Sequence, residues 1–121
     1  MTRLHTITRL TKEGSTFTAT ITLDPGHPVF AGHFPGQPVV PGVFLVEIIS
    51  SVISQMTGKK LIVTEIANIK FLSMIDPSEH SVLLIDGSIV EEQDNAFKVS
   101  GRIYYEDVEF AKFKGMLLEP L

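Results

Sequence analysis

The chain has 121 residues, of which 44% are hydrophobic and 20% are charged, a length and composition typical of one compact domain over residues 1–121. Its net charge is −4 and it has no basic run longer than Lys59-Lys60, which argues against nucleic acid as a partner, because affinity for the phosphate backbone depends on clustered Lys and Arg. The absence of cysteine excludes disulfides, thiolate catalysis and thiolate metal ligands, and it fits a cytoplasmic location.

The N-terminal third predicts one or two strands followed by a long irregular loop. The first six residues lack the apolar stretch of a signal peptide, so we expect no export. Residues 3–10 form a weak candidate strand, and residues 15–23 alternate β-branched or aromatic side chains with small polar ones, which indicates a strand with one buried face. Residues 25–42 carry five prolines and four glycines. An ordered loop of this length is usually functional.

Residues 43–56 predict a helix, because they contain no glycine or proline and are followed by a Thr57-Gly58 stop and two lysines. The segment is apolar nearly all round, so we expect a helix buried in the core. Its apolar stretch is far shorter than the roughly 20 residues that cross a bilayer, so we expect no membrane span. Glu47 is its only charged residue.

The C-terminal half predicts four strands, over residues 61–72, 81–91, 97–105 and 108–118. Short polar segments separate them, which favours hairpins and an antiparallel sheet. The predicted fold class is therefore α+β, with five or six antiparallel strands wrapped around one helix.

Two titratable residues in the loop and the helix, His33 and Glu47, are candidates for acid–base chemistry. His33 stands between Gly32 and a Phe-Pro-Gly turn that holds the imidazole on a rigid backbone, and histidine suits general-base catalysis near neutral pH. A carboxylate in an apolar helix pairs, becomes protonated or faces a cavity, and a protonated Glu47 is a proton donor. Each residue has a plainer alternative role, a hydrogen bond to a loop carbonyl for His33 and a structural hydrogen bond for Glu47.

The start of the helix supplies a third element. The backbone amides of Gly42, Val43 and Phe44 have no acceptor within the helix and lie at the positive end of its dipole, so they can hold a developing oxyanion. Together these parts suit removal of a proton beside a carbonyl and protonation of a β-hydroxyl leaving group. Dehydration of a 3-hydroxyacyl thioester is such a reaction, although the same logic accepts other carbonyl compounds.

Residues 32–47 resemble the signature of the bacterial 3-hydroxyacyl-(acyl-carrier-protein) dehydratases of type II fatty-acid synthesis, in which His-Phe-Pro-Gly precedes a Pro-Gly-Val turn and a helix that carries the acid. His33 falls on the family's catalytic histidine and Glu47 on its catalytic acid. Gly42 and Val43 fall on the amide-bearing turn. A weaker match covers residues 69–72.

The resemblance implies a hot-dog fold and a homodimer, or a higher oligomer, whose active sites combine His33 of one subunit with Glu47 of the other. It implies a 3-hydroxyacyl thioester of acyl carrier protein or coenzyme A as substrate, a trans-2-enoyl thioester as product, an acyl tunnel, and no cofactor or metal. Glutamate at position 47 is similar to the branch that does not isomerise its product. The prolines between His33 and the helix favour extended backbone, which gives modest support to a shared site.

Two departures from the family pattern indicate a divergent branch, in polyene or secondary lipid synthesis in place of bulk fatty acids. Ser51 replaces the common glutamine one turn after the acid, and residues 74–78 replace the usual Pro-Gly-Asp turn. An accessory subunit without activity and an acyl thioesterase stay open as alternatives. The retained His33 and Glu47 argue against the accessory subunit, and the His-Phe-Pro-Gly turn argues against the thioesterase.

The remaining histidines and the basic residues complete the predictions. We expect solvated or loop-satisfied roles, outside the site, for His5, His27 and His80, and of these only His27, six residues before His33, stays open. A negative chain that docks a negative carrier needs a local basic patch, for which the candidates are Lys59, Lys60, Lys70 and Arg102.

Overall fold

The computed structural model describes residues 4–28, 39–92 and 96–119, leaving aside the side chains of residues 63–67. One sheet and one long helix account for most of them. The elements, in chain order, are β1 (His5–Glu13), β2 (Thr16–Leu23), α2 (Gly42–Thr57), β3 (Ile62–Phe71), β4 (Val82–Glu91), β5 (Phe97–Tyr105) and β6 (Val108–Leu118).

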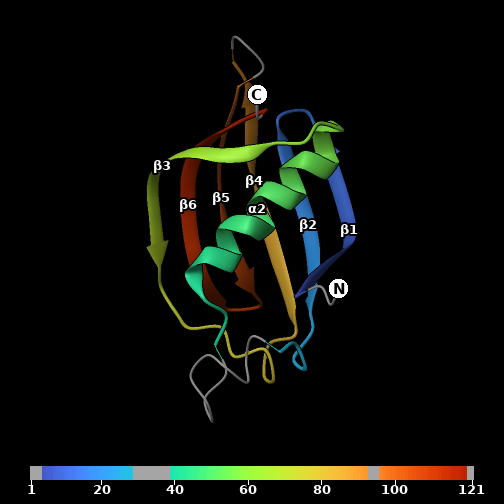
Figure 1. The fold of residues 1–121 in the computed structure, drawn as a ribbon, viewed down its shortest axis with the longest axis vertical. Coiled ribbons are helices and arrows are strands. Elements are labelled where there is room, and N and C mark those ends of the chain that lie inside the picture. Colours follow the sequence, from blue (N-terminus) through green and yellow to red (C-terminus); the bar gives the residue numbers. More distant parts are fainter. Residues whose placement is uncertain (1–3, 29–38, 93–95, 120–121) are drawn as a thin grey trace.

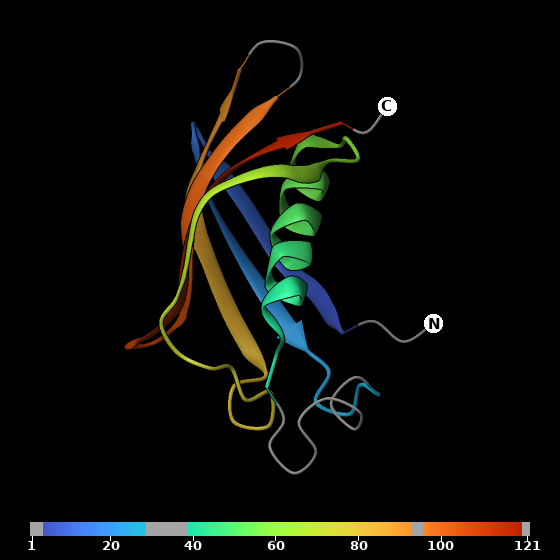
Figure 2. The same ribbon diagram turned by 60° about the vertical axis from the view of Figure 1, so that its left-hand side comes forward.

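The six strands form one antiparallel sheet in the order β1-β2-β4-β5-β6-β3. The sheet curves around α2, which crosses its concave side (Figures 1 and 2). The connection through α2 carries the chain from β2 to β3 at the far edge of the sheet. The α+β class and a six-stranded sheet around one helix are thus confirmed.

Two glycines permit the sheet to bend. Gly87 of β4 and Gly101 of β5 are directly paired. A Cβ on Gly87 would overlap the backbone oxygen of Ser100, and a Cβ on Gly101 would overlap that of Asp86. Neither position tolerates a side chain, so the two strands can approach closely where the sheet wraps around the helix.

The core lies between the concave face of the sheet and one side of α2. Alternate residues of the strands point inward, as in β2, where burial alternates along the strand. The helix contributes five buried side chains at spacings of one, three and four residues, which places them on one face: Leu45, Ile48, Ile49, Val52 and Ile53.

The end of α2 is fixed by backbone geometry and one side chain. Gly58 takes a left-handed conformation (φ 73°), and its N–H donates to the Ser54 carbonyl oxygen at 3.0 Å, as expected for a glycine stop. The Ser54 hydroxyl donates to the Leu61 carbonyl oxygen at 3.1 Å and accepts from the Leu61 N–H at 2.9 Å. These bonds tie the helix to the start of β3.

The predicted elements are all present, with boundary differences of a few residues at most. The helix extends one residue further at each end than predicted, while β5 and β6 have the predicted bounds. The weak strand at residues 3–10 is a full strand that continues to Glu13, because it pairs along its length with β2. The expectation of a helix buried nearly all round holds only for its inner face, since Val43 and Glu47 are exposed.

Candidate functional site

Glu47 lies on the outward face of α2. It is the only charged residue of the helix and is exposed, and the five buried helix residues point to the opposite side. In the part of the chain that the structure describes, its carboxylate forms no ion pair or hydrogen bond. An exposed carboxylate retains its hydration, so in the single chain Glu47 avoids the desolvation cost that the sequence suggested.

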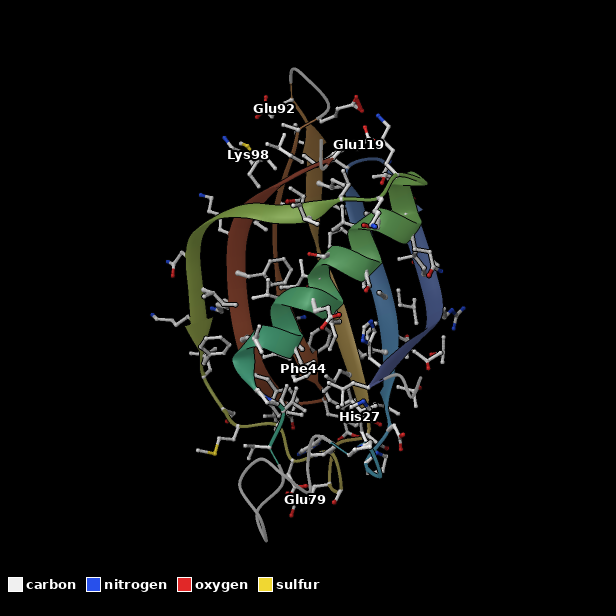
Figure 3. The ribbon with its side chains drawn as sticks, viewed as in Figure 1. His27, Phe44, Glu79, Glu92, Lys98 and Glu119 are labelled. Carbon is white, nitrogen blue, oxygen red and sulfur yellow. The ribbon has the colours of Figure 1, made fainter. Side chains whose placement is uncertain are left out.

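A trough of about 1100 Å³ runs beside Glu47 between α2 and β1. The helix contributes Phe44, Ser51, Ser54 and Gln55 to its wall, and β1 and the turn after β2 contribute His5 and His27. Lys59 and Lys60 lie at the other end, after the helix. Figure 3 shows His27 and Phe44 near the N-terminal end of α2. The trough is open and its lining mixes polar and apolar side chains, and among the described residues that line it Glu47 is the only acidic one.

The N-terminus of α2 has no side-chain cap. Pro41 is the N-cap residue, no side chain accepts from the first turn, and the first turn contains no acidic residue. The Phe44 N–H donates to the Pro41 carbonyl oxygen at 3.0 Å. Within the described residues, the amides of Gly42 and Val43 are therefore not satisfied by a capping side chain.

Two contacts fix the position of this helix start. The N–H of Val40, itself buried, donates to the Ile75 carbonyl oxygen at 2.9 Å. The ring of Phe71 lies over Gly42, so close that a Cβ there would be 2.9 Å from the ring carbon Cζ. Glycine at position 42 thus allows the end of β3 to approach the helix start.

The predicted site residues are only partly described. Gly42, Val43 and Glu47 lie together on the first turns of α2, and Val43 and Glu47 are one turn apart on the same face. His33 lies outside the described residues, so its pairing with Glu47 stays a prediction. The described chain shows no hydrogen bond between Ser51 and Glu47, although both line the trough.

Two histidines that sequence reasoning placed outside the site line the same trough as Glu47. They are His5 and His27, and no spacing along the chain relates either residue to Glu47. Only the pairing of β1 with β2 and the turn after β2 bring them to the helix. His80, in contrast, packs edge-on against Phe110, with ring centroids 5.1 Å apart, which agrees with a structural role.

A small apolar cavity lies on the other side of the helix. Val46 and Ile49 of α2, with Ile69, Val99 and Phe113 of the sheet, form most of its lining, which exposes no polar surface. Its volume of about 20 Å³ is close to that of a single water-sized sphere. An acyl chain of any length that enters here must displace neighbouring side chains.

The described residues include no group of three His, Cys, Asp or Glu side chains arranged to hold a metal ion. Over the same residues, no helix has the length and apolar character needed to cross a membrane.

A six-stranded antiparallel sheet curved around one long helix defines a hot-dog fold. The fold is shared with a chain of the dehydratase heterocomplex ApeI:P from Xenorhabdus doucetiae (TM-score 0.72, 20% identity, 94% of this chain and 97% of the other). It is also shared with a thioesterase, PA1618, from Pseudomonas aeruginosa (TM-score 0.59, 12% identity, 92% of this chain and 78% of the other).

The sequence defines the family more narrowly than the fold does. The model of the ApeI-like family, described as ApeI dehydratase, matches residues 9–114, and the chain belongs to this family of dehydratases. It is also 31% identical over 88 residues to the 3-hydroxyacyl-(acyl-carrier-protein) dehydratase FabZ of Fusobacterium nucleatum, an alignment that covers 69% of this chain and 61% of that enzyme. The chain thus spans about three fifths of the length of the curated relatives it matches. The resemblance to the dehydratases noted from residues 32–47 is confirmed at the level of the family.

Proposed function

We propose that this chain is a hydro-lyase that dehydrates 3-hydroxyacyl thioesters to trans-2-enoyl thioesters. The observation that carries the proposal is the placement of Glu47, the only charge on α2, one turn from Val43 on the same exposed face. This face combines a carboxyl group with uncapped backbone amides. Membership of the ApeI-like dehydratase family and similarity to FabZ support the same reaction.

The proposed chemistry requires three functions from this chain. The amides of Gly42 and Val43 hold the thioester oxygen, on which negative charge develops. His33 removes a proton from C2, and the electron pair of that C–H bond forms the C2–C3 double bond. The C3–O bond breaks, the protonated carboxyl of Glu47 donates its proton, and water leaves. His33 then carries one extra proton and Glu47 lacks one, so exchange with solvent resets the site.

The proposed site is completed by a second copy of the chain. Glu47 is exposed in the single chain, and burial of its carboxyl by a partner would favour the protonated form that the reaction needs. Within the described residues, β3 pairs with β6 on one side and with no strand on the other. Exposed apolar side chains continue from this edge to the helix start: Ile62, Phe71, Leu72, Met74 and Val43. A free edge beside exposed apolar groups is typical of a surface that a partner covers.

We propose homodimers joined along β3, or higher oligomers of such dimers, in which His33 of one copy pairs with Glu47 of the other, as the resemblance to the dehydratases implies. The relatives named FabZ act on acyl-carrier-protein substrates according to their names, and we propose acyl carrier protein as the carrier here, with coenzyme A as the alternative. The pathway would be fatty-acid synthesis or a related lipid or polyene pathway in the cytoplasm.

Two other roles have support in particular observations. The similar chain from Xenorhabdus doucetiae belongs to a heterocomplex of dehydratase subunits, which fits an accessory subunit that acts beside an active partner. The fold is shared with a thioesterase, which fits hydrolysis of the same thioester. Neither role requires the His33 and Glu47 pair.

One assay separates the three roles. We expect the purified protein to hydrate a crotonyl thioester reversibly, with loss of activity in His33→Ala and in Glu47→Gln and no release of thiol. His27→Ala is the matched control, because His27 also lines the trough beside Glu47 but has no proposed step in the reaction. Thiol release without hydration would favour the thioesterase, and inactivity of the wild type on every chain length would favour the accessory role. Equal losses in His27→Ala and His33→Ala would contradict the assignment of His33 as the base.

A further inference from the structure

The outer face of the sheet carries a row of cations that no part of the proposed reaction uses. Arg102 of β5 is directly paired with Lys112 of β6, and Lys112 is directly paired with Lys70 of β3. Lys114 follows two residues after Lys112 and therefore lies on the same face. Along β6, Lys112 and Lys114 are exposed while Ala111 and Phe113 are buried, so the row faces away from the helix. We call these four cations the basic row: Lys70, Arg102, Lys112 and Lys114.

This arrangement is electrostatically unfavourable in the isolated chain. Side chains that are directly opposite on neighbouring strands have Cβ atoms about 5 Å apart, and like charges there are destabilising. Only part of the charge is compensated. Arg102 donates to Asp86 through Nε (3.1 Å) and Nη2 (3.2 Å), and Lys112 lies 3.8 Å from Glu109.

Two members of the basic row lack this compensation. In the described part of the chain, neither Lys70 nor Lys114 forms an ion pair. Among the described side chains, the row therefore has four cations and two carboxylate partners, Asp86 and Glu109, on a chain whose net charge is −4. A surface whose sign opposes that of the rest of the protein is a feature that selects a charged partner.

The basic row ends beside the candidate site. Lys70 is the last outward-facing residue of β3, and the next residue, Phe71, contacts Gly42 at the start of α2. Figure 1 shows the arrowhead of β3 beside the lower end of α2, where the helix starts. A partner bound to the basic row therefore lies on the outer face of the sheet, and the end of β3 stands between this partner and the amides of Gly42 and Val43. A long flexible arm attached to the partner could reach those amides past the strand end.

We propose that the basic row is the docking surface for an acidic carrier protein that delivers the thioester on its prosthetic arm. This inference rests on the proposed function, because it supplies the partner for the same site. It changes the set of candidate docking residues. Lys70 and Arg102 are retained, Lys112 and Lys114 are added, and Lys59 and Lys60 are assigned to the trough beside the helix.

The test is direct binding of a purified bacterial acyl carrier protein that carries phosphopantetheine, measured by calorimetry against the wild type and Lys112→Glu/Lys114→Glu. We expect the double variant to weaken binding by at least about tenfold, and added salt to weaken wild-type binding in the same direction. The matched control is Arg9→Glu/Lys12→Glu, which changes net charge equally on exposed positions of β1, at the opposite edge of the sheet. We expect the control to bind as the wild type does, and circular dichroism should show that both variants fold.

Wild-type affinity in Lys112→Glu/Lys114→Glu would overturn the docking surface, as would an equal loss in the control. Preferential binding of the basic row to anionic lipid vesicles or to nucleic acid would overturn it too. Because binding is measured without turnover, a chain that binds the carrier but hydrates no thioester would refute the proposed reaction and leave the docking surface intact. In an active chain, the docking variant should raise KM for the carrier-bound substrate and leave kcat/KM for a carrier-free thioester unchanged.

Discussion

Replacement of Gly42 by alanine should separate activity from stability. The new Cβ would lie 2.9 Å from Cζ and 3.2 Å from Cε1 of Phe71. The Phe71 side chain is at the surface, with 54% of the residue exposed, so the ring can turn away without opening a core cavity, at a cost below about 1 kcal/mol. Gly42 does not have a positive φ, and alanine in a helix gains about 0.5–1 kcal/mol over glycine. The two effects nearly cancel, so Tm should change by less than about 4 °C.

The activity of Gly42→Ala should fall much more than its stability. The methyl group and the displaced ring would occupy the approach to the amides of Gly42 and Val43, and loss of one oxyanion donor lowers kcat about 100-fold or more. Hydration of a crotonyl thioester and thermal unfolding should be measured on the same preparation.

The control lies at the other end of the helix. Gly58 has φ 73° and open space around it, so Gly58→Ala should cost about 1–2 kcal/mol through backbone strain and leave kcat of the folded protein unchanged. A Gly42→Ala protein with wild-type kcat and wild-type Tm would refute the role of the Gly42-Val43 amides in holding the thioester oxygen.

Three further predictions concern the framework and its electrostatics. Gly87→Ala should destabilise the protein by about 3 kcal/mol or more, because its Cβ overlaps the neighbouring backbone; a denaturant midpoint equal to that of the wild type would contradict the close approach of β4 and β5. Ser54→Ala should lower the free energy of unfolding in urea by about 1–3 kcal/mol, because it removes both hydrogen bonds to the buried Leu61 backbone. A smaller loss would mean that water replaces these bonds. Burial raises the pKa of Tyr104 most, and the Asp86 carboxylate raises it further. Asp86→Asn should therefore lower this pKa towards 10.0. An unchanged NMR titration of the Tyr104 ring would show that Asp86 does not act on it.

The sequence predicted the elements well because their signals are local. Period-two burial in β2 and the Thr57-Gly58 stop of the helix follow directly from residue types. The prediction of a helix buried nearly all round was too broad, because a mostly apolar helix does not reveal which side faces the sheet. Only the fold shows that Glu47 points away from the core.

The surroundings of Glu47 depend on contacts between distant segments. His27 reaches the trough through the turn after β2, and Phe71 reaches Gly42 from the end of β3. The basic row likewise depends on strand order, since β3 lies beside β6 although about forty residues separate Lys70 from Lys112. Lys112 and Lys114 have no signal along the chain that links them to Lys70.

In the proposed dimer, two chains share a dehydratase site made of His33 and Glu47. The most direct measurement is the hydratase activity of a re-equilibrated equal mixture of His33→Ala and Glu47→Gln, each inactive alone. Half of the dimers would be mixed, and each mixed dimer would contain one site with both residues intact, so we expect about one quarter of wild-type activity. A mixture that stays inactive, although exchange of subunits is verified by mass spectrometry, would contradict the shared site.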